Sequence, residues 1–362
     1  MNILENLESF GFAMPLLAFV FSFFISYLSI PSIIQVAQLK HLFDEPDKRK
    51  LHKTKIPTLG GLAIFAGMTV STLLFTNISK TPELQYVLAA ILILFFIGIK
   101  DDIIILSALS KFLGQILATI IIVWFGNIRI ESFGGIFGIH NLPYLASISF
   151  SMLTLLVIIN SLNLIDGIDG LAGTISFIVI SAYAAWFYKA GFNEELIFSL
   201  AAMGALLAFL RYNITPAKIF MGDTGSLLMG TIIGVLTIKF VALNRHTIEE
   251  HKFHSAPVLA ISILIIPLFD LARVFFVRIL NGKSPFNPDK IHVHHKLLDL
   301  GLNHLQATFL LSTVNVMFIC FVFVFQKYNI TYLFLSIIII AVFLMLLLEY
   351  FLRRKINQDA KK

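Results

Sequence analysis

Long apolar runs, separated by short polar segments, recur from one end of the chain to the other. Each run has about 16 to 22 residues, which is enough, or nearly enough, for a helix to cross a hydrocarbon layer of roughly 30 Å. The pattern predicts an all-α polytopic integral membrane protein in which residues 1–362 form a single transmembrane domain. Eleven spans are expected, at approximately residues 12–34, 58–76, 85–99, 112–126, 143–160, 171–188, 196–212, 225–242, 257–276, 306–326 and 331–352.

The composition supports this class. The chain is 58% hydrophobic and 13% charged, and its mean hydropathy is +0.89, which excludes an ordinary soluble globular protein. The segment MNILENLESF has two glutamates and no lysine or arginine, so we expect the first span to remain as a helix rather than to be a removed signal peptide. The single cysteine, Cys320, argues against an internal disulfide and a cysteine metal site.

The basic residues predict an orientation. With the N-terminus outside and the C-terminus cytoplasmic, twenty of the 27 lysines and arginines fall on the inside segments, as the positive-inside rule requires. The net charge of +6 then faces anionic lipids and substrates, and no nucleic-acid partner is needed to explain it. The polar clusters also fall on this side, in loops at about 36–57, 100–111, 160–172, 211–226 and 277–305.

Five aspartates in these loops indicate a cation site: Asp101, Asp102, Asp166, Asp169 and Asp223. Carried to the bilayer centre they would together cost on the order of 15 kcal/mol, so they must line a wet cleft or the membrane edge. Carboxylate and amide oxygens without thiolates favour Mg²⁺, or Mn²⁺, over Zn²⁺. Basic residues suited to phosphate lie in the same loops, and acidic and basic groups together are typical of phosphoryl transfer. These basic residues are Lys53, Lys55, Arg278, Lys283, Lys290, His292, His294 and His295.

The stretch NSLNLIDGIDGLAG, residues 160–173, carries the most informative spacing. If the fifth span continues as a helix through it for a turn or two, Asn160, Asn163 and Asp166 lie along one side. Gly167 and Gly170 then end the helix and let backbone N–H groups approach a ligand. A plain Asp/Gly turn is the alternative for this segment taken alone.

Four motifs, NSLNLIDGIDGLAG, FMGDTGSLLMG, GIKDDI and DKIHVHHKLL, resemble those of the polyprenyl-phosphate N-acetylhexosamine-1-phosphate transferases, over about residues 12 to 326. The resemblance implies a bacterial inner-membrane enzyme, its active site facing the cytoplasm, that transfers a sugar phosphate from a UDP-N-acetyl sugar to undecaprenyl phosphate, releases UMP and begins a cell-envelope glycan. The run His292-Val293-His294-His295 favours the branch that uses UDP-GlcNAc. The alternative is phospho-N-acetylmuramoyl-pentapeptide transferase, which typically has three consecutive histidines.

The resemblance also implies roles for individual residues. Asp223 would bind the metal, with Asn163 as a second contact. The catalytic group would be Asp101, Asp102, Asp166, His292, His294 and His295. The substrate-binding group would be Lys53, Thr58, Asn160, Asp169, Asn213, Phe220 and Arg278, with Phe220 stacking on uracil. We expect direct attack by the lipid phosphate rather than a phospho-aspartate intermediate. Membrane lipids are further partners, and a homodimer formed through the membrane helices is open.

Two other interpretations bear on these residues. An ion-coupled secondary transporter also places acidic and asparagine residues on broken helices, but its site lies near the bilayer midplane, whereas every cluster here is expected at one face. Asp270 and Arg273, spaced i, i+3 in the ninth span, are expected to form a structural ion pair.

Overall fold

The computed structural model describes residues 12–43, 56–280, 282 and 291–359. Within them the chain is helical, apart from loops and one isolated antiparallel bridge between Ser132 and Asn141. The helices are α2 (Ala13–Leu39), α3 (Gly60–Phe75), α4 (Leu84–Ile103), α5 (Ala108–Ile120), the π-helix η1 (Ile121–Phe125), the 3-10 helix η2 (Ile136–Gly138), α6 (Tyr144–Ile165), α7 (Leu171–Ala190), α8 (Asn193–Asn213), α9 (Gly222–Asn244), α10 (Ala256–Ile263), α11 (Ile265–Leu280), α12 (Val293–Asp299), α13 (His304–Phe325) and α14 (Ile330–Asp359).

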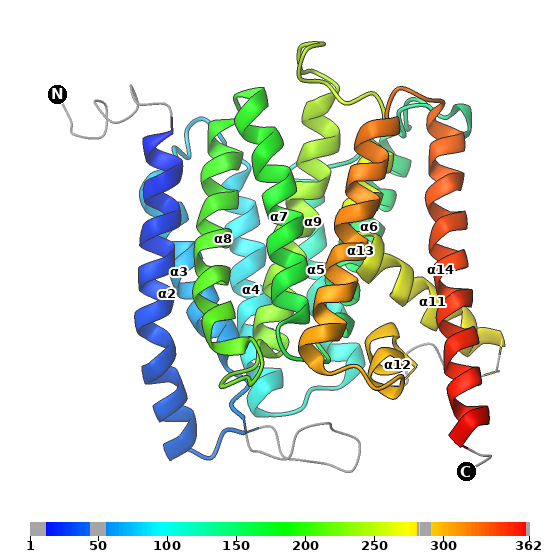
Figure 1. Cartoon of the computed structure of the whole chain (residues 1–362). Coiled ribbons are helices and arrows are strands. Elements are labelled where there is room, and N and C mark those ends of the chain that lie inside the picture. Colours follow the sequence, from blue (N-terminus) through cyan, green and yellow to red (C-terminus); the bar gives the residue numbers. More distant parts are fainter. Residues whose placement is uncertain (1–11, 44–55, 281, 283–290, 360–362) are drawn as a thin grey trace.

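The long helices stand side by side as a bundle, and short α12 lies at one end of it, near the last turns of α14 (Figure 1). Every predicted span falls on helical residues, and the span at 257–276 is divided between two helices, but the count of eleven spans is not confirmed. Within the described residues, eight helices are long and apolar enough to cross a membrane, and a ninth is counted if α10 and α11 form one broken span. Helix α3, with 16 residues, is shorter than this requirement.

Residues 257–276, predicted as one span, are not one straight helix. Helix α10 ends at Ile263, α11 starts at Ile265, and the two axes differ by 76°. Pro267 stands in the first turn of α11, where its ring and missing N–H are tolerated. Because of this bend, α11, which carries Asp270, runs obliquely across the bundle (Figure 1).

Helix α9 is the central element, since 83% of the residues in its apolar 18-residue stretch are buried. Glycines allow its neighbours to approach closely, as small residues do between membrane helices. A Cβ on Gly61 of α3 would lie 2.2 Å from the Gly225 nitrogen, and one on Gly98 of α4 would lie 2.4 Å from the Thr224 Cα. On another side, a Cβ on Gly230 would lie 2.6 Å from the Ile159 Cα of α6. Three helices therefore fix the position of α9.

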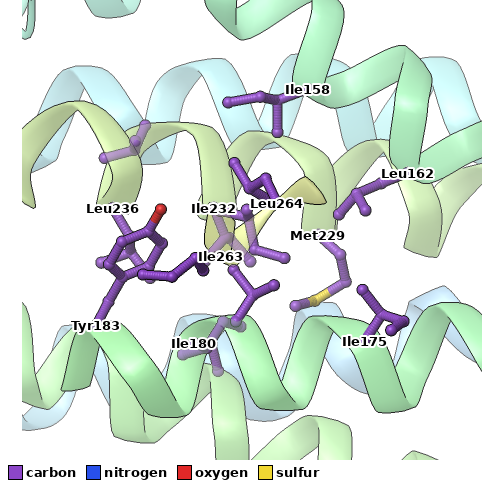
Figure 2. Packing of buried hydrophobic residues seen from close by; sticks show 14 of the residues in the cluster. Ile158, Leu162, Ile175, Ile180, Tyr183, Met229, Ile232, Leu236, Ile263 and Leu264 are labelled. Carbon is purple, nitrogen blue, oxygen red and sulfur yellow. The ribbon is translucent and has the colours of Figure 1, made fainter. Parts of the chain in front are cut away.

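The apolar core continues from α9 to α6, α7 and α10 (Figure 2). Met229, Ile232 and Leu236 of α9 point toward Ile175 and Ile180 of α7 in this view. One polar contact is embedded in this layer, where the hydroxyl groups of Tyr183 and Thr237 lie 2.9 Å apart. Pairing two buried hydroxyls avoids the cost of leaving either without a partner.

Candidate active site

The segment before α3 runs beside the segment before α9. Phe220 N–H donates to the Pro57 carbonyl at 2.8 Å, and Gly60 N–H donates to the Phe220 carbonyl at 2.9 Å. These bonds place Thr58 and Phe220, two expected substrate-binding residues, on adjacent loop segments. Both side chains are half-buried.

Gly222, in the MGDTGS motif, has a conformation and surroundings that exclude a side chain. Its φ is +70°. A Cβ there would lie 2.0 Å from the Thr58 carbonyl oxygen and 2.7 Å from Asp102 Oδ2. Glycine is therefore required at the point where α9 begins.

Asp102 caps the first turn of α9. Its Oδ1 accepts from Asp223 N–H at 2.7 Å, and its Oδ2 accepts from Thr224 N–H at 3.0 Å and from the Thr224 hydroxyl at 2.5 Å. A carboxylate at a helix N-terminus satisfies free N–H groups and is favoured by the helix dipole. Asp102 is thus committed to holding Asp223, a role that sequence reasoning did not assign to it.

Asp101, the neighbour of Asp102, faces a lysine that the sequence analysis did not select. Lys111 Nζ lies 2.8 Å from Asp101 Oδ2 and 2.5 Å from Asp223 Oδ1, and its side chain is 18% exposed. Asp101 Oδ1 accepts from Leu106 N–H at 2.6 Å. The available signal was the placement of Lys111 one residue before the predicted span at 112–126, ten residues after Asp101.

The asparagines of α6 are placed as the helical spacing predicted, since α6 continues to Ile165. The Asn163 amide donates to Asp223 Oδ1, and to Ser226 Oγ at 2.8 Å. Asn160, one turn earlier, donates to the Gln115 side chain of α5 at 2.7 Å. Asn163 therefore contacts the expected metal ligand directly, whereas Asn160 ties α6 to α5.

Asp166 follows the last residue of α6 and is half-buried. Burial, followed by the negative charges of Asp223, Asp102 and Asp169, raises the pKa of this carboxyl to about 7. No hydrogen bond to its carboxylate is present among the described residues. The four carboxylates from α4, α9 and the 166–169 turn are thus close enough to repel one another.

Asp169 and Asn213 hold the loops beside the aspartate cluster. Asp169 Oδ1 lies 3.2 Å from His304 Nδ1 of α13, and Asp169 Oδ2 accepts from Ala217 N–H at 3.2 Å. Asn213 accepts from Gly170 N–H at 3.0 Å and donates to the Ile219 carbonyl at 2.9 Å. Both residues therefore organise the backbone between Tyr212 and Phe220, which includes the segment leading to the expected uracil-stacking residue Phe220.

The three histidines of the HVHH run gather at the start of α12. His292 is the N-cap residue, and the ring centroids of His294 and His295 are 4.3 Å apart. Asp270 positions the run: its Oδ2 lies 2.8 Å from His292 Nδ1, and its Oδ1 accepts from Val293 N–H at 3.0 Å. The expected ion pair of Asp270 with Arg273 is confirmed, with Asp270 Oδ1 3.2 Å from Arg273 Nη2.

His294 connects this run to the aspartate turn. A Cβ on Gly167 would lie 2.2 Å from His294 Nε2, so the imidazole packs on the backbone beside Asp166. Its Nε2 is buried and has no hydrogen-bond partner among the described residues. Burial, and then the charge of His295, lower the pKa of His294 to about 3, so the ring is neutral at pH 7.

The remaining expected residues are less closely placed. Lys53 and Lys55 lie outside the described residues, as do Lys283 and Lys290. Arg278 is buried near the end of α11, at 5% exposure.

The described residues fit Mg²⁺ as part of a site completed by substrate. They contain no group of three His, Cys, Asp or Glu side chains arranged to hold a metal. Asp223, however, has a side chain 30% exposed, and Asp166 lies near it with no hydrogen-bond partner for its carboxyl among the described residues. Mg²⁺ commonly takes one or two carboxylates and fills its other positions with water and phosphate oxygens.

Comparison with known proteins gives the family. Residues 84–241 match glycosyl transferase family 4. A Bacillus subtilis protein named probable undecaprenyl-phosphate N-acetylglucosaminyl 1-phosphate transferase is 32% identical over 344 residues, which cover 92% of this chain and 90% of that protein. The chain belongs to glycosyl transferase family 4. The family resemblance found in the motifs is therefore confirmed, and the chain is a membrane-bound transferase.

Two further relatives of this family 4 transferase have related names. The undecaprenyl-phosphate alpha-N-acetylglucosaminyl 1-phosphate transferase of Haemophilus influenzae is 34% identical over 83% of this chain and 84% of its own length. The decaprenyl-phosphate N-acetylglucosaminephosphotransferase of Mycobacterium leprae is 31% identical over 74% of this chain and 72% of its own length. Membership of a transferase family argues against the secondary-transporter alternative.

Proposed function

We propose that this enzyme transfers GlcNAc-1-phosphate from UDP-GlcNAc to undecaprenyl phosphate, releases UMP and thereby begins a cell-envelope glycan. The observation that carries the proposal is the meeting of the KDD, NSLNLIDGIDG, MGDTGS and HVHH motifs at one end of the bundle. The names of the relatives support the sugar and the lipid. The setting we propose is the bacterial cytoplasmic membrane with the site on the cytoplasmic face, and it rests on the distribution of basic residues.

The charges of the substrates determine which residues are needed at the site. Two phosphorylated substrates repel each other, so bringing them together in a cleft rich in carboxylates requires cations. Mg²⁺ held by Asp223, with Asp166 and the oxygen of Asn163 as further candidates, would neutralise phosphate charge. Lys111 would supply the second cation: with Asp223 engaged by the metal, Asp101 would hold the Lys111 ammonium in position to bind a phosphate oxygen.

The reaction is a direct displacement. A phosphate oxygen of the lipid attacks the β-phosphorus of UDP-GlcNAc, the bond from that phosphorus to the bridging oxygen breaks, and UMP leaves with the oxygen. One phosphoanhydride replaces another, so the reaction should be reversible with added UMP. The acceptor phosphate is mostly ionised at neutral pH, so Asp101 and Lys111 are needed for position more than for proton removal.

The histidines and the 57–61 and 220–222 segments lie where the nucleotide would bind. Phe220 offers a half-buried ring for uracil, beside Thr58. The neutral His294, with an unsatisfied Nε2 against Gly167, can donate to or accept from a pyrophosphate or sugar atom according to its tautomer. The UDP-sugar is thus proposed to bridge the α9 start and the α12 start.

The test is UMP release by the purified full-length chain in detergent, with UDP-GlcNAc, Mg²⁺ and undecaprenyl phosphate. Turnover should need no sealed compartment and should stop with EDTA. Asp223→Asn should abolish it or greatly raise the Mg²⁺ requirement, whereas Glu249→Gln, an exposed acidic residue outside the site, should behave as wild type. No UMP release from the wild-type chain with any UDP-N-acetyl sugar, UDP-N-acetylmuramoyl-pentapeptide included, would refute the proposal. UMP release with UDP-N-acetylmuramoyl-pentapeptide but with no other UDP-N-acetyl sugar would assign the enzyme to the peptidoglycan branch.

A further inference from the structure

An apolar cavity of about 330 Å³ lies among α11, α12, α13 and α14, away from the aspartate cluster. Its lining is almost wholly aliphatic and aromatic, and Asp270 is the one charged residue in it. Representative lining residues are Phe269, Val293, Val314, Leu348 and Phe351.

The surroundings of the cavity indicate hydrocarbon as its content. In the apolar 18-residue stretches of α13 and α14, only 33% and 17% of the residues are buried, so most of these two helices faces outward. An aliphatic cavity does not hold water well, because water there finds no polar partners. A void of this size also deprives its lining of dispersion contacts. In a bilayer, the chains that can supply those contacts are lipid chains.

Basic residues lie beside one end of the cavity. Phe351 lines it, and Arg353, Arg354 and Lys355 follow directly on α14. Lys355 is half-buried and donates to the Asp299 carbonyl at 2.9 Å, a neutral acceptor that leaves the ammonium charge uncompensated by this contact. Figure 1 places this end of α14 near α12. A phosphate at the membrane surface would be attracted to such a group.

We propose that this cavity binds an anionic phospholipid of the bilayer, with an acyl chain between α13 and α14 and its phosphate at Lys355 and the neighbouring arginines. The polyprenyl chain of the acceptor is a less suitable occupant. Its phosphate must reach Asp101 and Asp223, and neither α4 nor α9 contributes to the cavity lining.

The site is connected to the catalytic histidines. Asp270 and Val293 both line the cavity, and Asp270 holds His292 and the Val293 N–H. A bound chain therefore supports the start of α12 from behind. This functional part rests on the proposed transferase activity, whereas the binding itself does not.

The experiment compares two tryptophan variants of α13. Val314 lines the cavity, and Val316, two residues later, is 41% exposed and does not. Wild type, Val314→Trp and Val316→Trp are purified in mild detergent and examined by native mass spectrometry, with phosphatidylglycerol and phosphatidylcholine added in turn. Wild type and Val316→Trp should retain one phosphatidylglycerol per chain, with about tenfold preference over phosphatidylcholine, which corresponds to about 1.4 kcal/mol in total from the basic residues near the phosphate. Val314→Trp should lose it.

A second pair tests the phosphate end. Lys355→Gln should reduce the preference for phosphatidylglycerol severalfold, whereas Lys327→Gln, in the turn between α13 and α14 at their other end, should not. In nanodiscs, Val314→Trp should turn over in phosphatidylglycerol no faster than wild type does in phosphatidylcholine alone.

Equal retention by Val314→Trp and wild type, or no preference between the two lipids, would overturn the inference. Displacement of the bound lipid by undecaprenyl phosphate would assign the cavity to the acceptor chain instead. A Val314→Trp protein with altered elution or a lowered Tm would be replaced by Leu344→Trp, whose side chain lines the cavity from α14. Lipid retention is read without turnover, so failure of the proposed function would be seen separately.

Discussion

Removing the Asp102 carboxylate should unfold the protein more readily, which distinguishes this residue from its neighbour. Asp102→Ala leaves three donors without their acceptor: the N–H groups of Asp223 and Thr224 and the Thr224 hydroxyl. A buried donor without a partner costs about 1–3 kcal/mol. Water can reach this cleft, since the Asp223 side chain is 30% exposed, so the lower value applies to each donor. The expected loss is about 3 kcal/mol.

The control is Asp101→Ala. It removes the acceptor of one backbone N–H, that of Leu106, and leaves Lys111 paired with Asp223, so the expected loss is about 1 kcal/mol. Thermal unfolding in detergent, followed by the soluble monomer remaining after heating, measures both. The shift in Tm is roughly 2–4 °C per kcal/mol for 150–250 residues and falls as the chain lengthens. In this chain of 362 residues, Asp102→Ala should therefore lower Tm by roughly 4 °C, and Asp101→Ala by roughly 1–2 °C. Equal shifts for the two variants, or a wild-type Tm for Asp102→Ala, would refute the capping role.

Three further predictions concern residues around the same cleft. Gly222→Ala should prevent accumulation of folded protein, because φ is +70° and the Thr58 carbonyl oxygen would lie 2.0 Å from the new Cβ. The control Gly138→Ala, with φ +76° and nothing within 4 Å of the new Cβ, should remain soluble in detergent with a small loss of Tm. The free energy of unfolding should fall as pH decreases from about 7 to 5, because His294 takes up a proton below pH 6.5 in the unfolded chain, whereas its pKa in the folded protein is about 3. The loss is about 2 kcal/mol at pH 5. In His294→Gln, the dependence of Tm on pH should be weaker by that amount. Lys111→Gln should reduce kcat by roughly 10–100-fold, which is the value of one charge-assisted hydrogen bond. It should also lower the Mg²⁺ concentration that gives half the maximal rate, because a cation that competes for Asp223 is removed. An unchanged Mg²⁺ requirement would contradict this.

The helices and the meeting of the acidic motifs could be predicted from the sequence because both depend on local patterns. Apolar runs of sufficient length become helices in lipid, since each backbone N–H must find an internal partner there. The step of three between Asn160, Asn163 and Asp166 indicated one side of a helix, and α6 does continue to Ile165. The high cost of carboxylates in a membrane indicated that they line a wet cleft or lie at the membrane edge.

What could not be predicted depends on contacts between segments distant in the chain. Asp101 and Asp102 are adjacent and chemically identical, yet one pairs with Lys111 and the other caps α9, because successive residues of a helix point in different directions. The 76° bend before α11 required tertiary information, since Pro267 is compatible with a straight start of a helix. The conformation of the HVHH run also depends on distant contacts: His292 is the N-cap of α12 and pairs with Asp270 of α11, and the other two histidines lie in the first turn of α12.

The glycine contacts of α9 have a consequence for how the enzyme meets its two substrates. A helix whose backbone touches three neighbours has no room to slide or turn, so Asp223 keeps one depth and one direction throughout the reaction cycle. The soluble nucleotide and the lipid phosphate must then both travel to that fixed level, and any adjustment to their different sizes falls to the loops that surround it. Replacement of Gly61, Gly98 or Gly230 by larger residues should consequently alter the geometry of catalysis from a distance, even though none of these positions carries a reactive group.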